Sequence, residues 1–357
     1  MQKKELKIGN KIISENHPCF IIAEAGANFR ISNDSKKNFK QALKLIDFAA
    51  KAKADAVKFQ LYRAKKLYVK EAGYADYIGK KKSIYNIIKE MELPYEWLKK
   101  LKNYSKKKGL IFLCTPFDEE STDELEKIGI KAYKIASYTI SHIPLLKYIA
   151  KKGKPIIMST GAADKKDIKK AISVIRKTSN NQIALMQCTA KYPAPLETIN
   201  LKTIPEMKKQ FGVITGLSDH SREPHIAPIG AVALGAKIIE KHFTTNNNLP
   251  GPDHGFAILT NELKDLVTNI RNLEKCLGKS EKKVESAEQE LHQFCRRRIY
   301  AIKNIKKGET LTKENIAILR SGKKEKGLEP EHFEKLIGKK ANKNIVKNQP
   351  ILKGDIK

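Results

Sequence analysis

Short apolar segments alternate with amphipathic segments along the first 277 residues of the chain. Apolar residues recur at helical spacing between the short segments, which have the length of buried strands. The expected strands are 20–25, 56–60, 110–115, 131–137, 155–160, 182–189, 213–219 and 237–242. The expected helices are 36–51, 94–108, 118–128, 143–152, 164–177, 201–210, 226–236 and 261–277. This alternation predicts an α/β fold of the (β/α)8 TIM-barrel type rather than an open doubly wound sheet.

Residues 61–93 form a connection that is longer than a strand-to-helix loop usually needs. It contains glycines and several tyrosines, among them Tyr68, Tyr74, Tyr77 and Tyr85. Aromatic and flexible residues beside strand ends are typical of a lid that covers a substrate. A surface excursion without function is the alternative interpretation.

The pattern changes after residue 277. Residues 278–293 are charged and nearly free of large apolar side chains, which predicts a linker with up to one helical turn. Residues 305–316 and 345–356 then repeat one spacing of isoleucines, lysines and turn residues. This duplication predicts a small β-rich domain with internal pseudo-symmetry over residues 294–357. The expected domains are therefore a barrel at 1–277, the linker, and this second domain.

The chain is strongly basic, with a formal net charge of +31 over 357 residues. Such a charge alone suggests a polyanionic partner. The lysines, however, fall mostly on the expected solvent faces of helices, and no ribbon of aromatic and basic residues accompanies them. We therefore expect no nucleic-acid partner. No apolar run approaches the ~18 residues of a membrane span, and residues 1–10 lack an apolar signal core, so a cytoplasmic protein without a membrane partner is expected.

Two histidines lie at the ends of neighbouring expected strands, His220 after 213–219 and His242 at the end of 237–242. Side chains alternate along a strand, so Ser218 shares a face with His220, and Glu240 shares one with His242. The carboxyl ends of barrel strands meet at the catalytic face. Imidazoles with carboxylate or water ligands suit a divalent ion such as Mn, Zn, Fe or Co. A pair of satisfied polar residues at strand ends is the alternative.

Two lysines, Lys58 and Lys134, lie within otherwise apolar strands. A buried ammonium without a partner is costly, so each requires an anion. An internal ion pair with Glu24 or Glu240 would supply one. The hydroxyl-bearing residues at nearby strand ends favour a bound phosphate or carboxylate instead; they are Thr115, Ser137, Ser159, Thr160 and Ser218.

Short motifs follow one another in a fixed order over most of the chain. They are AEAGAN (23–28), VKFQ (57–60), CTPFDEES (114–121), AYKIAS (132–137), GKPIIMSTG (153–161), CTAKYPAP (188–195), GLSDH (216–220), ALGAKIIEKHFT (233–244) and PGPDH (250–254). From about Lys7 to Lys357 the chain resembles the sialic acid synthase family, and its last part resembles an antifreeze-like SAF domain of the β-clip type. The resemblance implies a synthase that condenses phosphoenolpyruvate with an N-acetylated amino sugar. The acceptor would be N-acetylmannosamine or a 6-deoxy diacetamido sugar, and the products a sialic acid-like nonulosonic acid and phosphate.

The resemblance also implies roles for particular residues. His220 and His242 would hold a divalent metal, commonly Mn2+, with Mg2+ or Co2+ as alternatives. Arg320 would reach from the SAF domain into the barrel of a second subunit, giving a domain-swapped homodimer. The residues implied in catalysis are Glu24, Lys58, Lys134, Glu240 and Asp253, with Glu24 a candidate base. Those implied in substrate binding are Thr115, Ser137, Thr139, Ser159, Tyr192, Ser218 and Arg320.

The sequence departs from the family pattern on the side expected to bind the sugar. Thr139 stands where many relatives carry a glutamate, and Ala190 stands where N-acetylneuraminate synthases carry an asparagine. A threonine hydroxyl can bind a sugar but is no base near neutral pH. The acceptor can therefore be of the neuraminic, legionaminic or pseudaminic type.

Two other functions remain open. One is a non-catalytic sugar-binding or polyanion-binding protein that keeps the fold, which Thr139 and the high charge favour. The other is a metal-dependent hydrolase on the same barrel. Such hydrolases need a third strong ligand or a second metal, and no early HxH pair supplies it.

Overall fold

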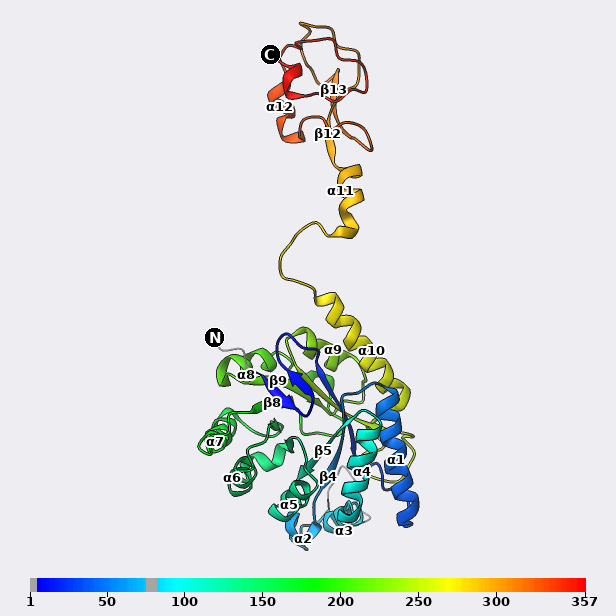
Figure 1. The fold of residues 1–357 in the computed structure, drawn as a ribbon, viewed down its shortest axis with the longest axis vertical. Helices are drawn as coiled ribbons and strands as arrows, with labels where there is room; N and C mark the ends of the chain where they lie inside the picture. Colours follow the sequence, from blue (N-terminus) through cyan, green and yellow to red (C-terminus); the bar gives the residue numbers. More distant parts are fainter. Residues whose placement is uncertain (1–4, 75–81) are drawn as a thin grey trace. The chain divides into compact units, whose positions relative to one another are not determined.

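A computed structural model describes residues 5–74 and 82–357 of the chain, so Tyr77 of the expected lid lies outside the described residues. The chain divides into two compact units, Met1–Gly278 and Lys279–Lys357 (Figure 1). Within the described part of the chain, none of the helices is both long and apolar enough to cross a membrane.

The first unit is a ring of parallel strands surrounded by helices (Figure 1). The strands are β3 (Phe20–Gly26), β4 (Ala56–Leu61), β5 (Ile111–Pro116), β6 (Tyr133–Ile135), β7 (Ile156–Ser159), β8 (Ile183–Cys188), β9 (Ile214–Asp219) and β10 (Ile238–Thr244). The outer helices are α1 (Ser35–Lys51), α4 (Tyr95–Lys107), α5 (Glu119–Lys127), α6 (Ile143–Ala150), α7 (Lys165–Arg176), α8 (Thr203–Phe211), α9 (Ile226–Ala233) and α10 (Thr260–Leu277). Hydrogen bonds link the strands in the order β5-β4-β3-β10-β9-β8-β7-β6, and β5 lies against β6 to bring the ring nearly to closure. The TIM-barrel prediction is confirmed.

Two elements are shorter than the sequence predicts by three residues or more. Strand β6 covers Tyr133–Ile135 instead of 131–137, because the chain turns into the 3-10 helix η2 (Ser137–Ser141). Helix α9 ends at Ala233 rather than at residue 236, since Gly235 adopts a φ of +92° that a helix cannot continue.

An N-terminal hairpin that we did not predict closes the amino-terminal end of the barrel. Strands β1 (Leu6–Ile8) and β2 (Lys11–Ile13) pair antiparallel. Their buried side chains pack in one apolar cluster with residues at the starts of the barrel strands, including Phe20 and Ala56. A Gly-Asn pair between alternating apolar residues was the available signal, and Gly9 has a φ of +61°.

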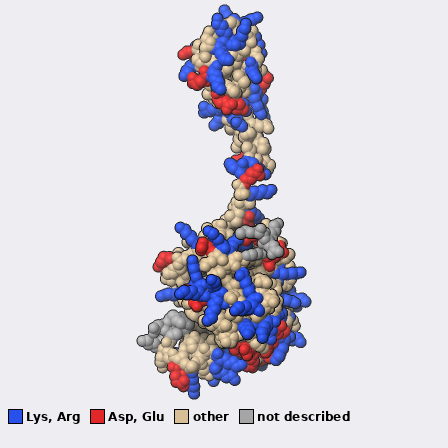
Figure 2. Space-filling view, turned by 90° about the vertical axis from the view of Figure 1, so that its left-hand side faces the viewer, with Lys and Arg blue, Asp and Glu red and all other residues tan. Residues whose placement is uncertain are grey.

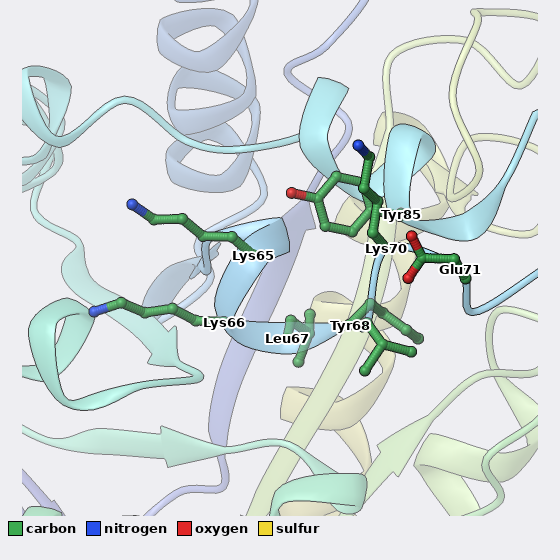
Figure 3. Close-up of a pocket in the computed structure, with 8 residues that line it drawn as sticks. Lys65, Lys66, Leu67, Tyr68, Lys70, Glu71 and Tyr85 are labelled. Atoms are coloured by element: carbon green, nitrogen blue, oxygen red, sulfur yellow. The ribbon is translucent and has the colours of Figure 1, made fainter.

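The long connection after β4 contains two short helices, α2 (Ala64–Leu67) and α3 (Ile84–Glu90). A small apolar cluster that includes Tyr62 and Met91 packs beneath them. A surface pocket lies at this connection (Figure 3), and its lining residues are Lys65, Lys66, Leu67, Tyr68, Val69, Lys70, Glu71 and Tyr85. The ammonium groups of Lys65 and Lys66 extend away from Tyr85 in this view (Figure 3). The lid function of the connection stays a prediction.

The lysines lie largely on the exposed faces of helices, as the sequence suggested. Figure 2 shows basic side chains distributed over this view of the barrel. Helix α7 illustrates the pattern, since its apolar residues Ile168, Ile172 and Ile175 are buried while its lysines are exposed. Exposed lysines in this arrangement solvate the helix and do not by themselves form a binding site.

The second unit begins with more helix than the predicted single turn. The 3-10 helix η4 (Ser286–Glu288) leads directly into α11 (Gln289–Cys295). Strands β12 (Arg297–Ala301) and β13 (Ile316–Arg320) then pair antiparallel. Three short helices complete the unit, namely η5 (Pro330–His332), α12 (Phe333–Leu336) and η6 (Lys353–Asp355).

The predicted internal duplication appears as paired hydrogen bonds. The backbone amide of Ile305 donates to the carbonyl of Ile345 at 2.8 Å, and the reverse bond has the same length. The amide of Lys307 donates to Asn344 Oδ1 and that of Lys347 to Asn304 Oδ1, both at 2.8 Å. In each case the second bond joins the residues that correspond to those of the first bond at a shift of forty positions. The pseudo-symmetry of this domain is therefore confirmed.

Candidate active site

A small polar cavity lies at the carboxyl ends of the barrel strands. Its lining residues are Glu24, Lys58, Gln60, Thr115, Lys134, Ala136, Ser137, Ser159, Tyr192, Ser218, His220, Glu240 and His242. The strand alternation that the sequence suggested therefore brings most of the predicted site residues to one place. The surface pocket of Figure 3 contains none of them.

Lys58 projects from β4 into the cavity and meets two acids of this chain. Its Nζ lies 2.9 Å from Glu24 Oε2 and 3.6 Å from Glu240 Oε1. It also donates to Thr115 Oγ1 at 3.1 Å. Burial opposes the charged form of Lys58, but Glu24 and Glu240 outweigh it and raise the pKa of this lysine. The internal ion pair with Glu24, the alternative to a bound anion, is thus present.

Lys134 projects from β6 on the other side of Glu240. Its Nζ donates to Ser159 Oγ at 2.6 Å and to the carbonyl of Ile135 at 3.3 Å, and lies 3.6 Å from Glu240 Oε1. Burial lowers the pKa of Lys134 despite the attraction of Glu240. Glu240 is thus shared between two lysines, and Lys134 makes no closer contact with a carboxylate among the described residues.

The two cavity glutamates differ in their electrostatics. Burial raises the pKa of Glu24 to about 7, although Lys58 and a 2.8 Å hydrogen bond from Gln60 Nε2 oppose the shift. Burial would also raise the pKa of Glu240, but Lys134 and Lys58 together hold it below its ordinary value. Glu240 is therefore the fixed counter-ion, and Glu24 is the carboxyl group that can exchange a proton near neutral pH.

The two histidines lie side by side, with ring centroids 5.6 Å apart and an interplanar angle of 69°. Nδ1 of His220 lies 2.9 Å from the carbonyl oxygen of Thr189, and Tyr192 stacks on the His220 ring at 4.1 Å. In the neutral ring, donation from Nδ1 to this carbonyl leaves a lone pair on Nε2. Burial opposes the charged ring, but Cys188, with Sγ 3.7 Å from Nδ1, outweighs it and raises the pKa of His220. Burial lowers the pKa of His242 far below its ordinary value, so this ring is neutral. Its Nδ1 is buried and has no hydrogen-bond partner within the described part of the chain.

The two histidines form a donor set for a divalent ion. Two neighbouring imidazoles, one with an orphaned ring nitrogen, are suitable first ligands. No group of three or more His, Cys, Asp or Glu side chains is arranged to hold a metal within residues 5–74 and 82–357. The pair consequently fits an ion that completes its coordination with water or substrate oxygens, as Mn2+ or Mg2+ does, better than a closed four-ligand zinc site.

Asp253 joins the site from the loop after β10. Its Oδ2 lies 3.8 Å from Nδ1 of His242 and accepts a 3.4 Å hydrogen bond from the amide of Ala27. Gly26 has a φ of +50°, and a Cβ at this position would lie only 2.8 Å from Asp253 Oδ2. A side chain at residue 26 would therefore displace the carboxylate. Phe256 packs against the same histidine, with ring centroids 5.1 Å apart.

Three predicted site residues are not among those that line the cavity, and one of them, Asp253, lies beside His242 instead. Thr139 is buried in η2, and Arg320 belongs to β13 of the second unit. The prediction did not include Gln60 and Phe256 among the site residues. Gln60 was detectable, because it lies two residues after Lys58 on the same face of β4, whereas Phe256 follows no periodic pattern.

Comparison with known families gives two matches. Residues 45–282 match the NeuB family, and residues 296–357 match the SAF domain. The two matches follow the division of the chain into two compact units.

Individual proteins are similar over nearly the whole chain. The spore coat polysaccharide biosynthesis protein SpsE of Bacillus subtilis is 45% identical, over 98% of this chain and 96% of that protein. The N,N'-diacetyllegionaminic acid synthase of Campylobacter jejuni is 39% identical, over 93% of this chain and 98% of that enzyme. The crystal structure of an N-acetylneuraminic acid synthetase from Leptospira borgpetersenii in complex with citrate is 36% identical, with a TM-score of 0.72 over 82% of this chain and 96% of that one.

Proposed function

The chain belongs to the NeuB family, and from this membership and the site geometry we propose that it condenses phosphoenolpyruvate with an N-acetylated amino sugar to form a nonulosonic acid. The observation that carries the proposal is the convergence of His220, His242, Lys58 and Lys134 in one buried cavity at the carboxyl ends of the strands.

Phosphoenolpyruvate carries a phosphate and a carboxylate, both of which ammonium groups and hydroxyls bind well. Lys134 is the more available lysine, because its nearest carboxylate oxygen is 3.6 Å away. Lys58 becomes available when Glu24 takes up a proton, since their contact is then no longer an ion pair. The hydroxyls that complete this side of the cavity are those of Thr115, Ser137, Ser159 and Ser218.

The charge balance of the cavity supports a bound divalent ion. Lys58 and Lys134 are matched by Glu24 and Glu240, so an anionic substrate requires further positive charge. His220 and His242 would hold this ion, most readily Mn2+, with Mg2+ or Co2+ as alternatives. When bound, the ion supplies Lewis-acid polarisation of the aldehyde oxygen of the open-chain sugar.

In the proposed reaction, carbon 3 of phosphoenolpyruvate attacks the aldehyde carbon, and a carbon–carbon bond forms. Carbon 2 becomes electron-poor and takes up water, whose proton passes to Glu24 in the fraction of complexes in which this carboxyl group is ionised, a fraction that its pKa of about 7 provides near neutral pH. Phosphate then leaves with cleavage of its bond to carbon 2. Lys58 and Lys134 stabilise the negative charge of the phosphate and carboxylate throughout. Tyr192 and Asp253 lie beside the histidines, where the sugar would be bound.

The assembly proposed for this chain is a homodimer in which Arg320 of one SAF domain serves the barrel of the other subunit. The support is the family membership together with the position of Arg320 at the end of β13, where its side chain is exposed. An exposed guanidinium suits recognition of a substrate carboxylate.

A panel of phosphate-release assays tests the proposed function. Phosphoenolpyruvate is supplied with N-acetylmannosamine, with 6-deoxy diacetamido sugars, or with no sugar. We expect phosphate release only when an N-acetylated sugar is present, and the preferred sugar identifies the product class. Binding of a sugar without phosphate release would favour the non-catalytic sugar-binding alternative, for which the internal pairing of Lys58 is the supporting observation. Release without any sugar would indicate a hydrolase.

A further inference from the structure

A buried ion pair joins β9 to β10 on the outer face of the barrel, away from the cavity. Nζ of Lys241 lies 2.6 Å from Oδ2 of Asp219, and the side chains are only 2% and 1% exposed. The two residues are direct partners in the parallel ladder between the strands. The residue that follows each of them in the chain is a proposed metal ligand, His220 after Asp219 and His242 after Lys241.

The same ammonium group also fixes the loop that follows β9. Nζ of Lys241 donates to the carbonyls of Ser221 at 2.6 Å and Glu223 at 2.8 Å. It also lies 3.1 Å from Ser221 Oγ, while Asp219 Oδ1 accepts from the amide of Ser221 at 2.8 Å. Lys241 therefore contacts both neighbours of His220 in the chain, Asp219 and Ser221.

This arrangement couples the outer face of the strands to the inner face. Side chains alternate along a strand, so Asp219 and Lys241 point outward while His220 and His242 point into the cavity. A buried ammonium tolerates little displacement from its acceptors, because an unpaired buried charge is costly. The pair therefore fixes the register of the two strands one residue before the histidines.

The histidine rings need this support to different extents. His220 has other restraints, namely the carbonyl of Thr189 and the ring of Tyr192. His242 Nδ1 has no hydrogen bond among the described residues and lies 3.8 Å from Asp253 Oδ2, so its ring position depends chiefly on packing and on where its backbone is held.

We propose that Asp219 and Lys241 are positioning residues, which set the separation of His220 and His242 and thereby the affinity of the site for its divalent ion. Neither side chain lines the cavity, so neither is expected to touch substrate. The inference rests on the proposed function, since it assigns the pair a role in that metal site.

The test compares Lys241→Met and Asp219→Asn with a matched control, Asp55→Asn. Asp55 is also a buried partner of an ion pair, with Oδ2 at 2.8 Å from Nη2 of Arg271, but it lies just before β4 at the opposite end of the barrel. Three quantities are measured on each full-length protein: Mn2+ affinity by electron paramagnetic resonance, kcat as a function of Mn2+ concentration, and the thermal unfolding temperature.

Lys241→Met is expected to weaken Mn2+ binding by at least about tenfold, with a lowered kcat that excess Mn2+ partly restores. Asp219→Asn is expected to have a smaller effect of the same kind, because an amide oxygen still accepts from Ser221. Asp55→Asn is expected to lower the unfolding temperature while Mn2+ affinity stays within about twofold of the unsubstituted protein.

Mn2+ affinities of Lys241→Met and Asp219→Asn that equal that of the unsubstituted protein would overturn the inference. So would losses that Asp55→Asn reproduces. If Lys241→Met does not fold, the Mn2+ affinity of Asp219→Asn alone decides whether the inference holds. If the unsubstituted protein binds no Mn2+, Mn2+ is refuted as the ion of the proposed function. A crystal structure of Asp219→Asn then tests positioning alone, and unchanged ring centroids, 5.6 Å apart, would overturn it.

Discussion

The Glu24 carboxylate and the Lys58 ammonium form a buried ion pair across β3 and β4, with 2.9 Å between Oε2 and Nζ. The two residues are direct partners in the ladder between these strands. Burial raises the pKa of Glu24 to about 7, so this pair changes its protonation state in the neutral pH range. The same lysine is proposed to bind phosphoenolpyruvate, which makes substrate and Glu24 competitors for one charge.

Phosphoenolpyruvate binding should therefore tighten as the pH falls from about 8.5 to about 7. Glu24 is protonated below its pKa and ionised above it, and Lys58 stays charged throughout because its pKa is raised. The dissociation constant is expected to rise with pH by up to about tenfold per unit above pH 7. Titration calorimetry without sugar measures it, since no turnover occurs. A dissociation constant that does not change over this range would contradict the competition.

The variant Glu24→Gln separates binding from turnover. An amide cannot form an ion pair with Lys58. The variant should therefore bind phosphoenolpyruvate at pH 8.5 about as tightly as the unsubstituted protein binds it near pH 7, as measured by titration calorimetry. Turnover should fall by about a hundredfold or more, because the proposed base is lost. Glu126→Gln is the control, since Glu126 pairs with Lys154 on the outside of the barrel. Full turnover by Glu24→Gln would remove Glu24 from the base role.

Lys134→Met should raise the KM for phosphoenolpyruvate by about 10- to 100-fold, the range expected when one hydrogen bond to a charged group is lost. Ser159→Ala should have a smaller effect of the same sign, because Ser159 accepts from Lys134 at 2.6 Å. Lys108→Met is the control, since Lys108 pairs with Asp47 at the surface. Steady-state kinetics with saturating sugar measures all three, and an unchanged KM for Lys134→Met would place the anion elsewhere.

Sequence reasoning predicted the barrel and most of the cavity for a specific physical reason. The period of two along β9 and β10 places Ser218, His220, Glu240 and His242 on one side, and parallel strands bring their carboxyl ends together. These relationships depend only on spacing within each strand. They are therefore readable from the chain without any structural information.

The sequence could not settle how Lys58 is paired. The outcome depends on the register between β3 and β4, which sets Glu24 opposite Lys58, with a register shift between Glu24 and Gly26. Spacing within one strand does not define the register with another. The same limit applies to Asp253 and Phe256, whose positions are set by an irregular loop.

The duplicated halves of the SAF domain should contribute equally to its stability. Ile305→Ala and Ile345→Ala each remove a fully buried side chain at equivalent positions, and each is expected to cost about 2–5 kcal/mol. Hydrogen exchange of the full chain measures this, through matching increases in amide exchange over Arg297–Ala301 and Ile316–Arg320. Val346→Ala is the control, because Val346 is exposed. Strongly unequal effects would contradict the equivalence of the halves.

The proposed exchange of SAF domains predicts complementation between two inactive variants. Subunits that carry His220→Ala lack a metal ligand, and subunits that carry Arg320→Ala lack the residue proposed to serve the partner. In mixed dimers one barrel has both residues, so a refolded equimolar mixture should recover about a quarter of full activity. Activity no higher than that of the separate variants would indicate that Arg320 serves its own barrel or none.

The most direct test of the account is phosphate release that depends on both substrates, compared between the unsubstituted protein and His220→Ala. The account predicts rapid release with phosphoenolpyruvate, Mn2+ and an accepted N-acetylated sugar, and none above background for the variant, which retains only His242 of the pair. Equal turnover by His220→Ala would contradict the claim that the two histidines at the barrel rim form the centre of this site.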